Sequence, residues 1–455
     1  MSGSARVCAT PPGPRGYPLL GVFPKARRDP LGFFLDAART FGDVVALPLG
    51  VRRLYLLAHP DHIRYVLQED DRHFLKRRAA ERIRPLFGTS LTTVDGEDWR
   101  RRRHLMRPVF TPQRMAALVP VIVESTDAML HRWRDRVGTG LVFDVFDEMT
   151  ELTRAIILRV LFGAVPQEEV RKVGQAITIV TERVNRGLWS TLGWLPRLPT
   201  PGRERFERAV STLDAFLTRR IDEGRQRPMD GGLLSALLAA GDAGSGQGLD
   251  DTELRDELKA LFVAGHSTIA SGLAWAWYLL SQNPGAQGRL RREVGAVLGM
   301  RRPNAEDLAA LEYTRLVIEE ALRLYPPTWI TARTTNDAVD IDGYRIPANA
   351  TVLLSPFVTH RDPRFWAEPE RFDPERFRPG HAARPRYAYF PFGGGPRTCI
   401  GSALATIEMQ VITAMVARRH EVTLAPGWRV EPEPGTVLVP RGGVRIVLGP
   451  GEPGV

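Results

Sequence analysis

One long segment of the chain, residues 251–282, has to be a buried helix, and this requirement constrains the fold more than any other feature. Asp250, Asp251 and Thr252 offer groups that can cap its first turn, and Asn283–Pro284 ends it. Apolar side chains coat much of its circumference: Leu254, Leu258, Leu261, Phe262, Ile269, Leu273 and Leu280. A helix that is apolar on most sides is buried. The sequence therefore predicts that other elements cover this helix on nearly every side.

The middle of this helix reads AGHST, which is an unusual run of small residues. Ala264 and Gly265 remove side chain from one face, and Ser267 and Thr268 add hydroxyl groups. A glycine inside a helix costs about 1 kcal/mol relative to alanine, so we expect something bulky to lie against that face. A close crossing with a second helix would explain the pattern equally well.

The rest of the chain predicts helices in the middle and strands toward both ends. Between about residues 95 and 325 nearly every segment follows helical periodicity. Three other stretches predict strands, the first with a turn near Gly50: residues 43–60, 340–356 and 428–448. Because strands from the two ends usually pair to bury a face, we expect one mixed domain. Residues 239–250 are expected to form a surface loop.

Composition and charge exclude several classes of protein. The chain is 43% hydrophobic and 25% charged, and it has no apolar run approaching the ~20 residues that span a bilayer. Residues 1–20 are proline-rich and lack the features of a secretory signal, so we expect a flexible segment and a cytoplasmic protein. The net charge of +10 suits acidic partners, but no nucleic-acid-binding motif accompanies it. A solvated arginine-rich surface is the simpler interpretation.

The stretch FGGGPRTCIG, residues 392–401, contains Cys399, and the other of the two cysteines, Cys8, lies in the expected flexible segment. A phosphate-binding loop would need a lysine after its last glycine, which is absent. A cysteine nucleophile would need a histidine base placed by the fold. A buried structural cysteine is the usual reading of a single thiol. The fourth possibility is a thiolate ligand to haem iron.

The residues around Cys399 favour the fourth possibility. Cys399 immediately precedes a strongly helical stretch, and the positive end of a helix dipole favours an anionic sulfur. The three glycines 393–395 let the backbone turn sharply, so that amide groups can point at the sulfur. Arg397, two residues earlier, can reach a carboxylate at the edge of a bound group.

These ten residues match the pattern Phe-x-x-Gly-x-Arg-x-Cys-x-Gly at every fixed position, so the chain resembles the cytochrome P-450 monooxygenases of the soluble bacterial type. The resemblance implies that Cys399 is the axial thiolate ligand of haem b and that Arg397 binds a haem propionate. Phe392, Gly393 and Gly401 would complete the haem-binding part of the loop. It also implies the cytochrome P-450 fold, mainly α with a minor β subdomain and a long central helix over the haem.

Under this resemblance, residues 21–455 would form a single haem-thiolate monooxygenase domain after the flexible segment 1–20. Its β-rich and helical parts are expected at the following positions: β-rich near 43–60, 331–358 and 425–449, and helical at about 95–325 and 399–420.

The second family pattern, Glu-x-x-Arg on a helix, is similar to Glu320 and Arg323, which share a helix face at i, i+3. The third is a Pro-Glu-Arg-Phe stretch, which occurs twice, at 369–372 and 374–377. Spacing to Cys399 favours the later copy. Arg376 would then join Glu320 and Arg323 in a buried structural triad, in which loss of one partner typically costs about 3–5 kcal/mol.

Further haem contacts are implied by resemblance. Trp99 and Arg103 match the family's Trp-x-x-x-Arg pattern, and Arg333 occupies the position of another propionate-binding arginine. The neighbouring run Arg100–Arg102 reads either as a solvated basic helix or as the surface where an acidic electron carrier docks.

AGHST is similar to the family's Ala-Gly-x-(Asp/Glu)-Thr. Ala264 and Gly265 would make room for haem and dioxygen, and Thr268 would help to deliver protons. Ser267 stands where the family has an acid, and a serine can relay a proton but cannot store a charge. His266 is interpreted as a packing residue. This departure leaves the route of proton delivery in question.

The resemblance implies insertion of one oxygen atom from O₂ into a lipophilic substrate, such as a terpenoid, a fatty acid or another secondary metabolite. Substrate contacts are expected at these positions: Ala260, Val263, Ala264, Thr328, Trp329 and Ile330. With no dinucleotide-binding motif in the chain, electrons would come from an external ferredoxin and its reductase. We expect a monomer without nucleic-acid partner or membrane anchor. A peroxide-using haem enzyme and a non-catalytic haem sensor remain alternatives.

Overall fold

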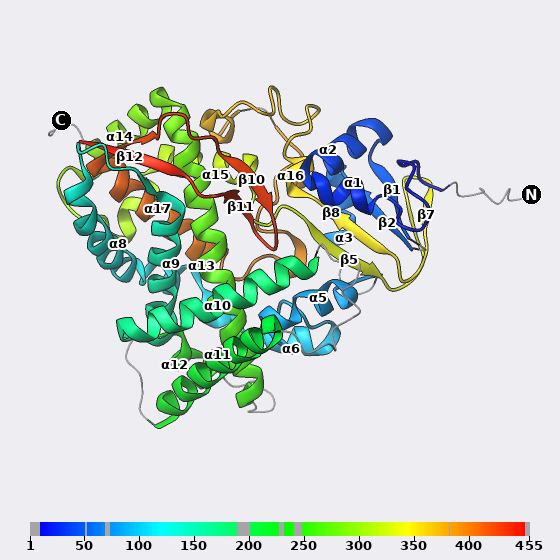
Figure 1. Cartoon of the computed structure of the whole chain (residues 1–455), viewed down its shortest axis with the longest axis horizontal. Helices are drawn as coiled ribbons and strands as arrows, with labels where there is room; N and C mark the ends of the chain where they lie inside the picture. The colour runs from blue at the N-terminus through cyan, green and yellow to red at the C-terminus, as the bar shows by residue number, and fades with distance from the viewer. Residues whose placement is uncertain are drawn as a thin grey trace, which may run out of the picture.

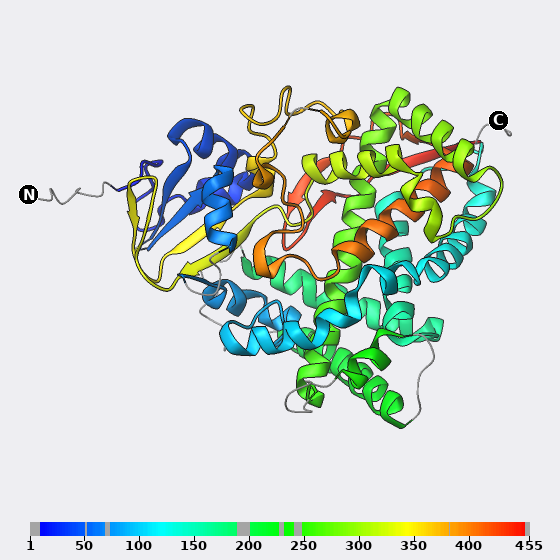
Figure 2. The same cartoon turned by 180° about the vertical axis from the view of Figure 1, so that it is seen from behind.

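A computed structural model describes residues 10–50, 52–68, 73–188, 201–226, 232–240, 248–381 and 383–450. The fold is mainly helical with small sheets (Figure 1). One end of the molecule contains most of the strands and the N-terminus, and the helices fill the rest, with α13 running through their middle (Figures 1 and 2). This is the predicted class of fold.

The α-helices have the following bounds: α1 Phe23–Arg28, α2 Pro30–Phe41, α3 Pro60–Gln68, α5 Arg77–Phe87, α6 Gly96–Met106, α7 Pro112–Ala116, α8 Val119–Trp133, α9 Val145–Phe162, α10 Gln167–Leu188, α11 Pro201–Gln226, α12 Leu233–Ala239, α13 Asp251–Gln282, α14 Pro284–Leu298, α15 Glu312–Leu324, α16 Pro356–Thr359 and α17 Ser402–Arg419. The strands are β1 Val44–Leu49, β2 Arg52–Leu57, β3 Phe74–Leu75, β4 Phe143–Asp144, β5 Thr331–Thr335, β6 Val339–Ile341, β7 Tyr344–Ile346, β8 Thr351–Leu354, β9 His420–Leu424, β10 Glu431–Pro434, β11 Leu438–Arg441 and β12 Arg445–Pro450.

The largest sheet joins strands that are far apart in the sequence. Its order is β1-β2-β8-β5-β3, and β2 runs parallel to β8 with Leu54 opposite Thr351. The expectation that strands from before and after the helical region pair with each other is confirmed for β2 and β8, but it does not hold for the last strands of the chain. The C-terminal strand β12 pairs instead with β9 and β4, where its Ile446 is buried in the helical core. The helices offer the C-terminal strands an apolar surface of their own.

The first hairpin forms where it was predicted. Gly50 adopts φ +60° between β1 and β2, a conformation that glycine adopts at no steric cost. Part of the segment expected to be flexible packs against this hairpin, because the Ala46 amide donates to the Pro12 carbonyl (2.8 Å). Cys8 and most of the loop expected at 239–250 lie outside the described residues.

The central helix has the predicted bounds and caps. Asp250 accepts a hydrogen bond from the Glu253 amide, and the Glu253 side chain accepts one from the Asp250 amide. This reciprocal pair satisfies two groups that a helix start leaves without partners. Most of its 32 residues are buried. Among the helices that the structure describes, none is long and apolar enough to cross a membrane.

Glu320 and Arg323 form a fully buried ion pair on α15. Arg323 donates to both carboxylate oxygens of Glu320, through Nε (2.6 Å) and Nη2 (2.8 Å), and both side chains are 0% exposed. Arg376 places its Nε 3.4 Å from the same carboxylate. Arg371, from the earlier Pro-Glu-Arg-Phe copy, pairs with Glu368 at the surface. The structure therefore brings Glu320, Arg323 and Arg376 together.

We predict that Glu320→Gln lowers the free energy of unfolding by about 3–5 kcal/mol, because it leaves two buried guanidinium groups without their carboxylate. Urea unfolding followed by helical circular dichroism would measure the loss. Glu312→Gln is the matched control, because Glu312 lies on the same helix as Glu320 and its ion pair with Arg378 is exposed. This substitution should change the free energy of unfolding by no more than about 0.5 kcal/mol. Equal losses in the two variants would contradict the prediction.

Candidate functional site

The loop of residues 392–401, called the cysteine loop from here on, turns sharply in front of α17. Gly393 and Gly395 adopt φ +70° and +66°, and a side chain on Gly395 would overlap the Leu67 carbonyl. The Cys399 amide donates to the Phe392 carbonyl (3.0 Å) and closes the turn. The glycines therefore allow a loop geometry that other residues at positions 393 and 395 would disrupt.

The Cys399 thiol borders an internal space. Its side chain is exposed, yet the protein around it is dense enough that burial raises the pKa of the thiol. The Gly401 amide and the charge of Arg103 act in the opposite direction and lower this pKa. An amide and a cation aimed at a buried sulfur favour its anionic form once a metal ion takes the place of the proton.

Arg397 connects the cysteine loop to the start of α6. Its Nη1 donates to the Val94 carbonyl (2.9 Å), and its Nη2 donates to Asp95 Oδ1 (2.8 Å). The guanidinium also lies over the ring of Trp99, 4.6 Å from its centroid. Asp95 was not anticipated from the sequence, and only its place four residues before Trp99 hinted at it. Its carboxylate also accepts the Lys76 amide, so it ties α5 and α6 to the loop.

Arg103 makes the second connection, because its Nη2 donates to the Thr398 carbonyl (2.9 Å). Burial lowers the pKa of Arg103, and the nearby Cys399 opposes that shift. Arg333 lies on β5, is only 3% exposed, and donates to Thr331 Oγ1 (3.3 Å) and the Ala332 carbonyl (3.1 Å). Trp99 and Arg103 thus contact the cysteine loop, and the Arg333 guanidinium hydrogen-bonds to its own strand.

One short stretch of α13 is open although most of the helix is buried. Ala264 is exposed, and Thr268, one turn later, is half-buried. The Thr268 hydroxyl donates to the Ala264 carbonyl (2.7 Å), and the Ser267 hydroxyl donates to the Val263 carbonyl (2.9 Å). An exposed patch in the middle of a buried helix borders an internal space. This patch is therefore the face of α13 that is available to a ligand.

Gly265 does not make room on that face, contrary to expectation. A side chain on Gly265 would lie 2.6 Å from Cδ1 of Ile157, so the small residue lets α9 approach instead. His266 also points away, stacks on Phe262 with ring centroids 5.1 Å apart, and contacts the Phe262 carbonyl through Nδ1. Burial lowers the pKa of His266 to about 4. His266 is therefore a neutral packing residue.

The residues expected to contact substrate fall into two groups. Ala264 and Thr328 are exposed and Ile330 is half-buried, so they can face a ligand. Three others are covered by protein, with exposed fractions of 5%, 3% and 4%: Ala260, Val263 and Trp329. Trp329 packs near Phe34 and donates from Nε1 to the Gly435 carbonyl (2.9 Å). These three side chains therefore present little open surface to a ligand in this structure.

The turn between β10 and β11 was not anticipated as part of the site. Ser271 and Trp275 on α13 both donate to the Leu438 carbonyl, at 2.5 and 3.0 Å. The Leu438 amide donates to the Pro327 carbonyl (2.9 Å). From α10, Asn185 accepts the Thr436 amide (2.8 Å). The turn therefore joins α10, α13 and the segment before β5, and no sequence pattern marked it.

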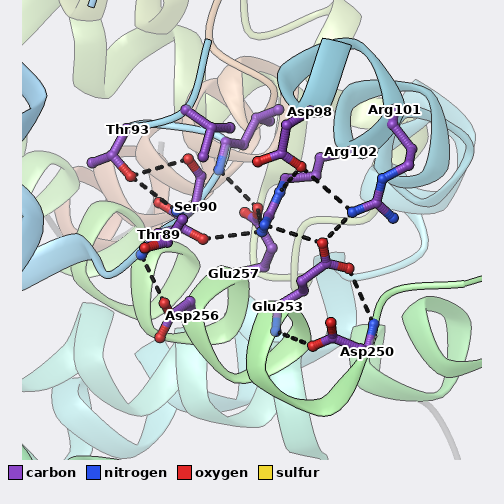
Figure 3. A network of polar contacts seen from close by, with 12 residues as sticks. Thr89, Ser90, Thr93, Asp98, Arg101, Arg102, Asp250, Glu253, Asp256 and Glu257 are labelled. Carbon is purple, nitrogen blue, oxygen red and sulfur yellow. Dashed lines mark hydrogen bonds and ion pairs between the residues drawn. The ribbon is translucent and has the colours of Figure 1, made fainter. Parts of the chain in front are cut away.

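Of the three arginines 100–102, Arg102 is not part of a solvated basic surface, whereas Arg100 and Arg101 remain partly exposed. Arg102 is 4% exposed and pairs with Asp98, Glu253 and Glu257 (Figure 3). Arg101 also reaches Glu253, and Arg100 pairs with Glu97. Arg102 turns inward because the facing surface of α13 carries acidic residues. The local positive charge is therefore largely compensated within the protein.

The residues of this site fit a haem group. A side chain on Gly393 or Gly401 would meet no atom within 4 Å, so open space adjoins the cysteine loop. Guanidinium groups such as Arg103 and Arg397 suit the two propionates of a haem. Within the described residues there is no group of three or more His, Cys, Asp and Glu side chains that could hold a metal ion. One thiol without protein co-ligands fits an iron held by a porphyrin.

Comparisons with known proteins agree with this geometry. The model of the cytochrome P450 family matches residues 11–447. Cyclooctatin synthase from Streptomyces melanosporofaciens is 37% identical over 441 residues, covering 96% of this chain and 93% of that protein. Cyclooctat-9-en-7-ol 5-monooxygenase from the same organism is 36% identical over 436 residues, covering 95% and 92%. Pentalenene oxygenase from Streptomyces avermitilis is 34% identical over 446 residues, covering 97% of both.

The family match implies haem-thiolate iron, and the relatives include named oxygenases that match along nearly the whole chain. The chain therefore belongs to the cytochrome P450 family and is an oxidoreductase that incorporates oxygen from O₂ into its substrate.

Proposed function

We propose that this protein holds haem b through the Cys399 thiolate and inserts one oxygen atom of O₂ into a lipophilic terpenoid. The observation that carries the proposal is the exposed thiol inside the protein, which is supported by Gly401 and Arg103. When bound, a haem-thiolate iron supplies the oxidising chemistry for attack on an unactivated C–H or C=C bond. The chain's own residues hold the group, exclude water and move protons.

Five residues around the cysteine loop and on β5 are the candidates to hold the group. Arg397 and Arg103 are near the thiol and carry charges that suit propionates, with Trp99 packed beneath the Arg397 guanidinium. Arg333 would add a third cation from β5, where it also hydrogen-bonds to Thr331 and Ala332. Phe392 packs against the main core and would support the thiol from below.

Thr268 is the residue that would move protons in the open stretch of α13. Its hydroxyl donates to the Ala264 carbonyl, so its lone pairs remain available to accept a proton from water. Ser267 lies beside it and makes the same kind of bond to Val263. We propose that both hydroxyls take part in the relay, in the absence of the acid that the family usually carries at position 267.

The proposed substrate class rests on the relatives and on the residues open to a ligand. The names of two relatives concern cyclooctat-9-en-7-ol and pentalenene. The candidates with surface open to a ligand, Ala264, Thr328 and Ile330, include one hydroxyl and no charged group. A ligand without charged groups suits these surroundings. A charged ligand would lose its hydration there and gain no oppositely charged partner from these three residues.

Electrons would come from an external acidic ferredoxin. The net charge of +10 favours such a partner, although Arg102 is not part of its docking surface. We propose a monomeric, cytoplasmic protein. A peroxide-driven reaction is the second candidate, which the serine at position 267 favours. Turnover with peroxide but not with ferredoxin and its reductase would establish that alternative.

We predict that Cys399→Ala abolishes the thiolate-type spectrum of the reduced protein with carbon monoxide, because no other described cysteine exists to ligate the iron. Cys8→Ser is the matched control and should keep the wild-type spectrum. An unchanged spectrum in Cys399→Ala would refute the assignment of the ligand.

Thr268→Ala is expected to uncouple the reaction, so that oxygen is consumed without a matching amount of product. Loss of one proton-transfer group typically lowers the rate about 10²–10⁴-fold, so product should fall while O₂ consumption and hydrogen peroxide release continue. Oxygen-electrode and product measurements would test this. Thr150→Ala on α9 removes the same kind of hydroxyl-to-carbonyl bond, here to Phe146, and should leave the ratio unchanged. Full coupling in Thr268→Ala would count against the relay.

Ligand titrations should separate terpenoids from fatty acids. We expect polycyclic terpene hydrocarbons to shift the haem spin state of the wild-type protein, because they displace water from the iron side of Ala264. Long-chain fatty acids of similar size should bind more weakly, since their carboxylate has no charged partner among Ala264, Thr328 and Ile330. A spin-state shift with fatty acids alone would overturn the terpenoid proposal.

A further inference from the structure

A buried group of charged residues joins α6, α13 and the loop of residues 88–93, outside the proposed haem site (Figure 3). Arg102 of α6 and Glu257 of α13 form its most buried pair, with exposed fractions of 4% and 1% and a distance of 3.1 Å from Nη1 to Oε1. Within the part of the chain that the structure describes, the hydrogen bonds and ion pairs of these two residues go to α6, α13 and the loop 88–93. Burying a charged group costs several kcal/mol of desolvation per ion, so an ion pair this deeply buried calls for a structural or functional explanation.

The loop 88–93 is attached to α13 through its backbone. The Thr89 amide donates to Asp256 Oδ2 (2.7 Å), and the Leu91 amide donates to Glu257 Oε1 (2.7 Å). Arg102 donates from Nη1 to the Thr89 carbonyl (3.0 Å). Two neighbouring carboxylates of α13 and one guanidinium of α6 therefore satisfy three backbone polar groups of this turn. Hydrogen bonds with ionised partners are about twice as strong as neutral ones.

The shape of the loop fits this attachment. Gly88 adopts φ +62°, and a side chain there would lie 2.5 Å from the Asp256 carboxyl carbon. Thr93 closes the turn by accepting the Ser90 amide (2.9 Å) and donating to the Gly88 carbonyl (2.7 Å). The turn is thus internally braced and lies directly on the α13 carboxylates.

Arg102 uses its whole guanidinium in this group. Besides Glu257 and Thr89, its Nε donates to Asp98 (2.8 Å) and its Nη2 to Glu253 (3.2 Å). The next residue, Arg103, points instead to the cysteine loop through the Thr398 carbonyl. Consecutive residues of a helix point about 100° apart. α6 therefore joins the cysteine loop on one side to α13 on another.

Glu257 also shares a face of α13 with the open stretch. Ala264 follows it by seven residues, close to two full turns, at about 10 Å along the helix axis. The Arg102–Glu257 contact is therefore made by the same side of the helix that presents Ala264. A change at this contact would alter the distance between that side of α13 and α6.

We propose that Arg102 and Glu257 are positioning residues: their contact sets the spacing between the open stretch of α13 and α6 with the cysteine loop, the two parts that would hold the haem between them. The inference rests on the proposed haem site. Buried ion pairs are weak sources of stability, and specifying one arrangement of packed elements is among their best-supported uses. The pair would govern how tightly the haem is held, without touching it.

The charge balance of the group makes this contact sensitive to pH. Burial raises the pKa of Glu257 to about 7, and Arg102 and the Leu91 amide oppose this shift. The charged groups that face or adjoin it are these: Asp98, Arg101, Arg102, Glu253, Asp256 and Lys259. As pH falls through about 7, Glu257 gains a proton and loses its charge attraction to Arg102, so we expect haem to be released faster.

The effect on global stability has the opposite sign. The folded-state pKa of Glu257 lies above the 4.5 of an ordinary glutamate. Its contribution to the free energy of unfolding is therefore present at low pH and is lost as pH rises through about 7. Between these values, acid stabilises the fold through this group while loosening the Arg102 contact. Faster haem release on acidification would thus not arise from unfolding caused by Glu257.

The experiment measures haem transfer from the loaded protein to excess apomyoglobin between about pH 6 and pH 8. Glu257→Gln keeps the size and the acceptor for the Leu91 amide but has no charge. We expect it to release haem about tenfold faster than wild type at about pH 8, a typical effect of losing an indirect support, and with little dependence on pH. Glu97→Gln, which removes the exposed Arg100 pair on α6, is the control and should match wild type.

A double variant separates positioning from general stabilisation. Arg102→Met with Glu257→Leu replaces the pair by apolar groups, which is often neutral or stabilising for the fold. We expect a wild-type unfolding midpoint together with fast haem release. Wild-type release from the double variant, or the same rates and pH profile in Glu257→Gln as in wild type, would overturn the proposal. If wild type itself shows no thiolate spectrum, the proposed function fails instead.

Discussion

The position of the Cys399 thiol depends on two arginine contacts that join the cysteine loop to α6. Arg397 reaches from the loop to Val94 and Asp95, and Arg103 reaches back from α6 to Thr398. Arginine stays charged in proteins, so these buried groups require oxygen partners, which the two segments supply to each other. The loop has few regular backbone hydrogen bonds of its own. Contacts that hold α6 in place therefore also help to hold the Cys399 sulfur in place.

The central helix α13 contributes the second part of the candidate site, and its side chains also hold neighbouring segments in place. One face of α13 is open at Ala264, while Ser271 and Trp275 bind the Leu438 carbonyl farther along. Toward its N-terminus, Asp256 and Glu257 bind the loop 88–93. One helix thus carries the open stretch at Ala264, the contact with the turn between β10 and β11, and the contact with the loop 88–93 and α6. This continuity explains why the helix tolerates so few exposed positions.

Local patterns in the sequence predicted much of the fold and part of the site. The bounds of α13, the turn at Gly50 and the i, i+3 pair Glu320–Arg323 follow from caps, positive φ and helix spacing. Pairing between strands on the two sides of the helical region was predicted, but the choice of β8 as the partner of β2 and the direction of Arg102 were not, because they depend on which distant surface lies opposite. The spacings Asp98–Arg102 and Glu253–Glu257 were visible, but nothing in one sequence showed that they face each other. Gly265 was misassigned for the same reason, since the neighbour that needs the space is Ile157.

The serine at position 267 changes the electrostatics of the open stretch as well as its proton chemistry. From Ala260 to the end of α13 the sequence contains no acidic residue, and His266 is neutral with its pKa lowered to about 4. In the proposed relay, protons would pass through the Thr268 and Ser267 hydroxyls and water, with no acidic side chain from Ala260 onward on the helix to attract them. A neutral relay has no carboxylate to desolvate when a large apolar substrate excludes water. The serine thus suits a bulky hydrocarbon ligand, at the expense of the driving force that an acid would provide.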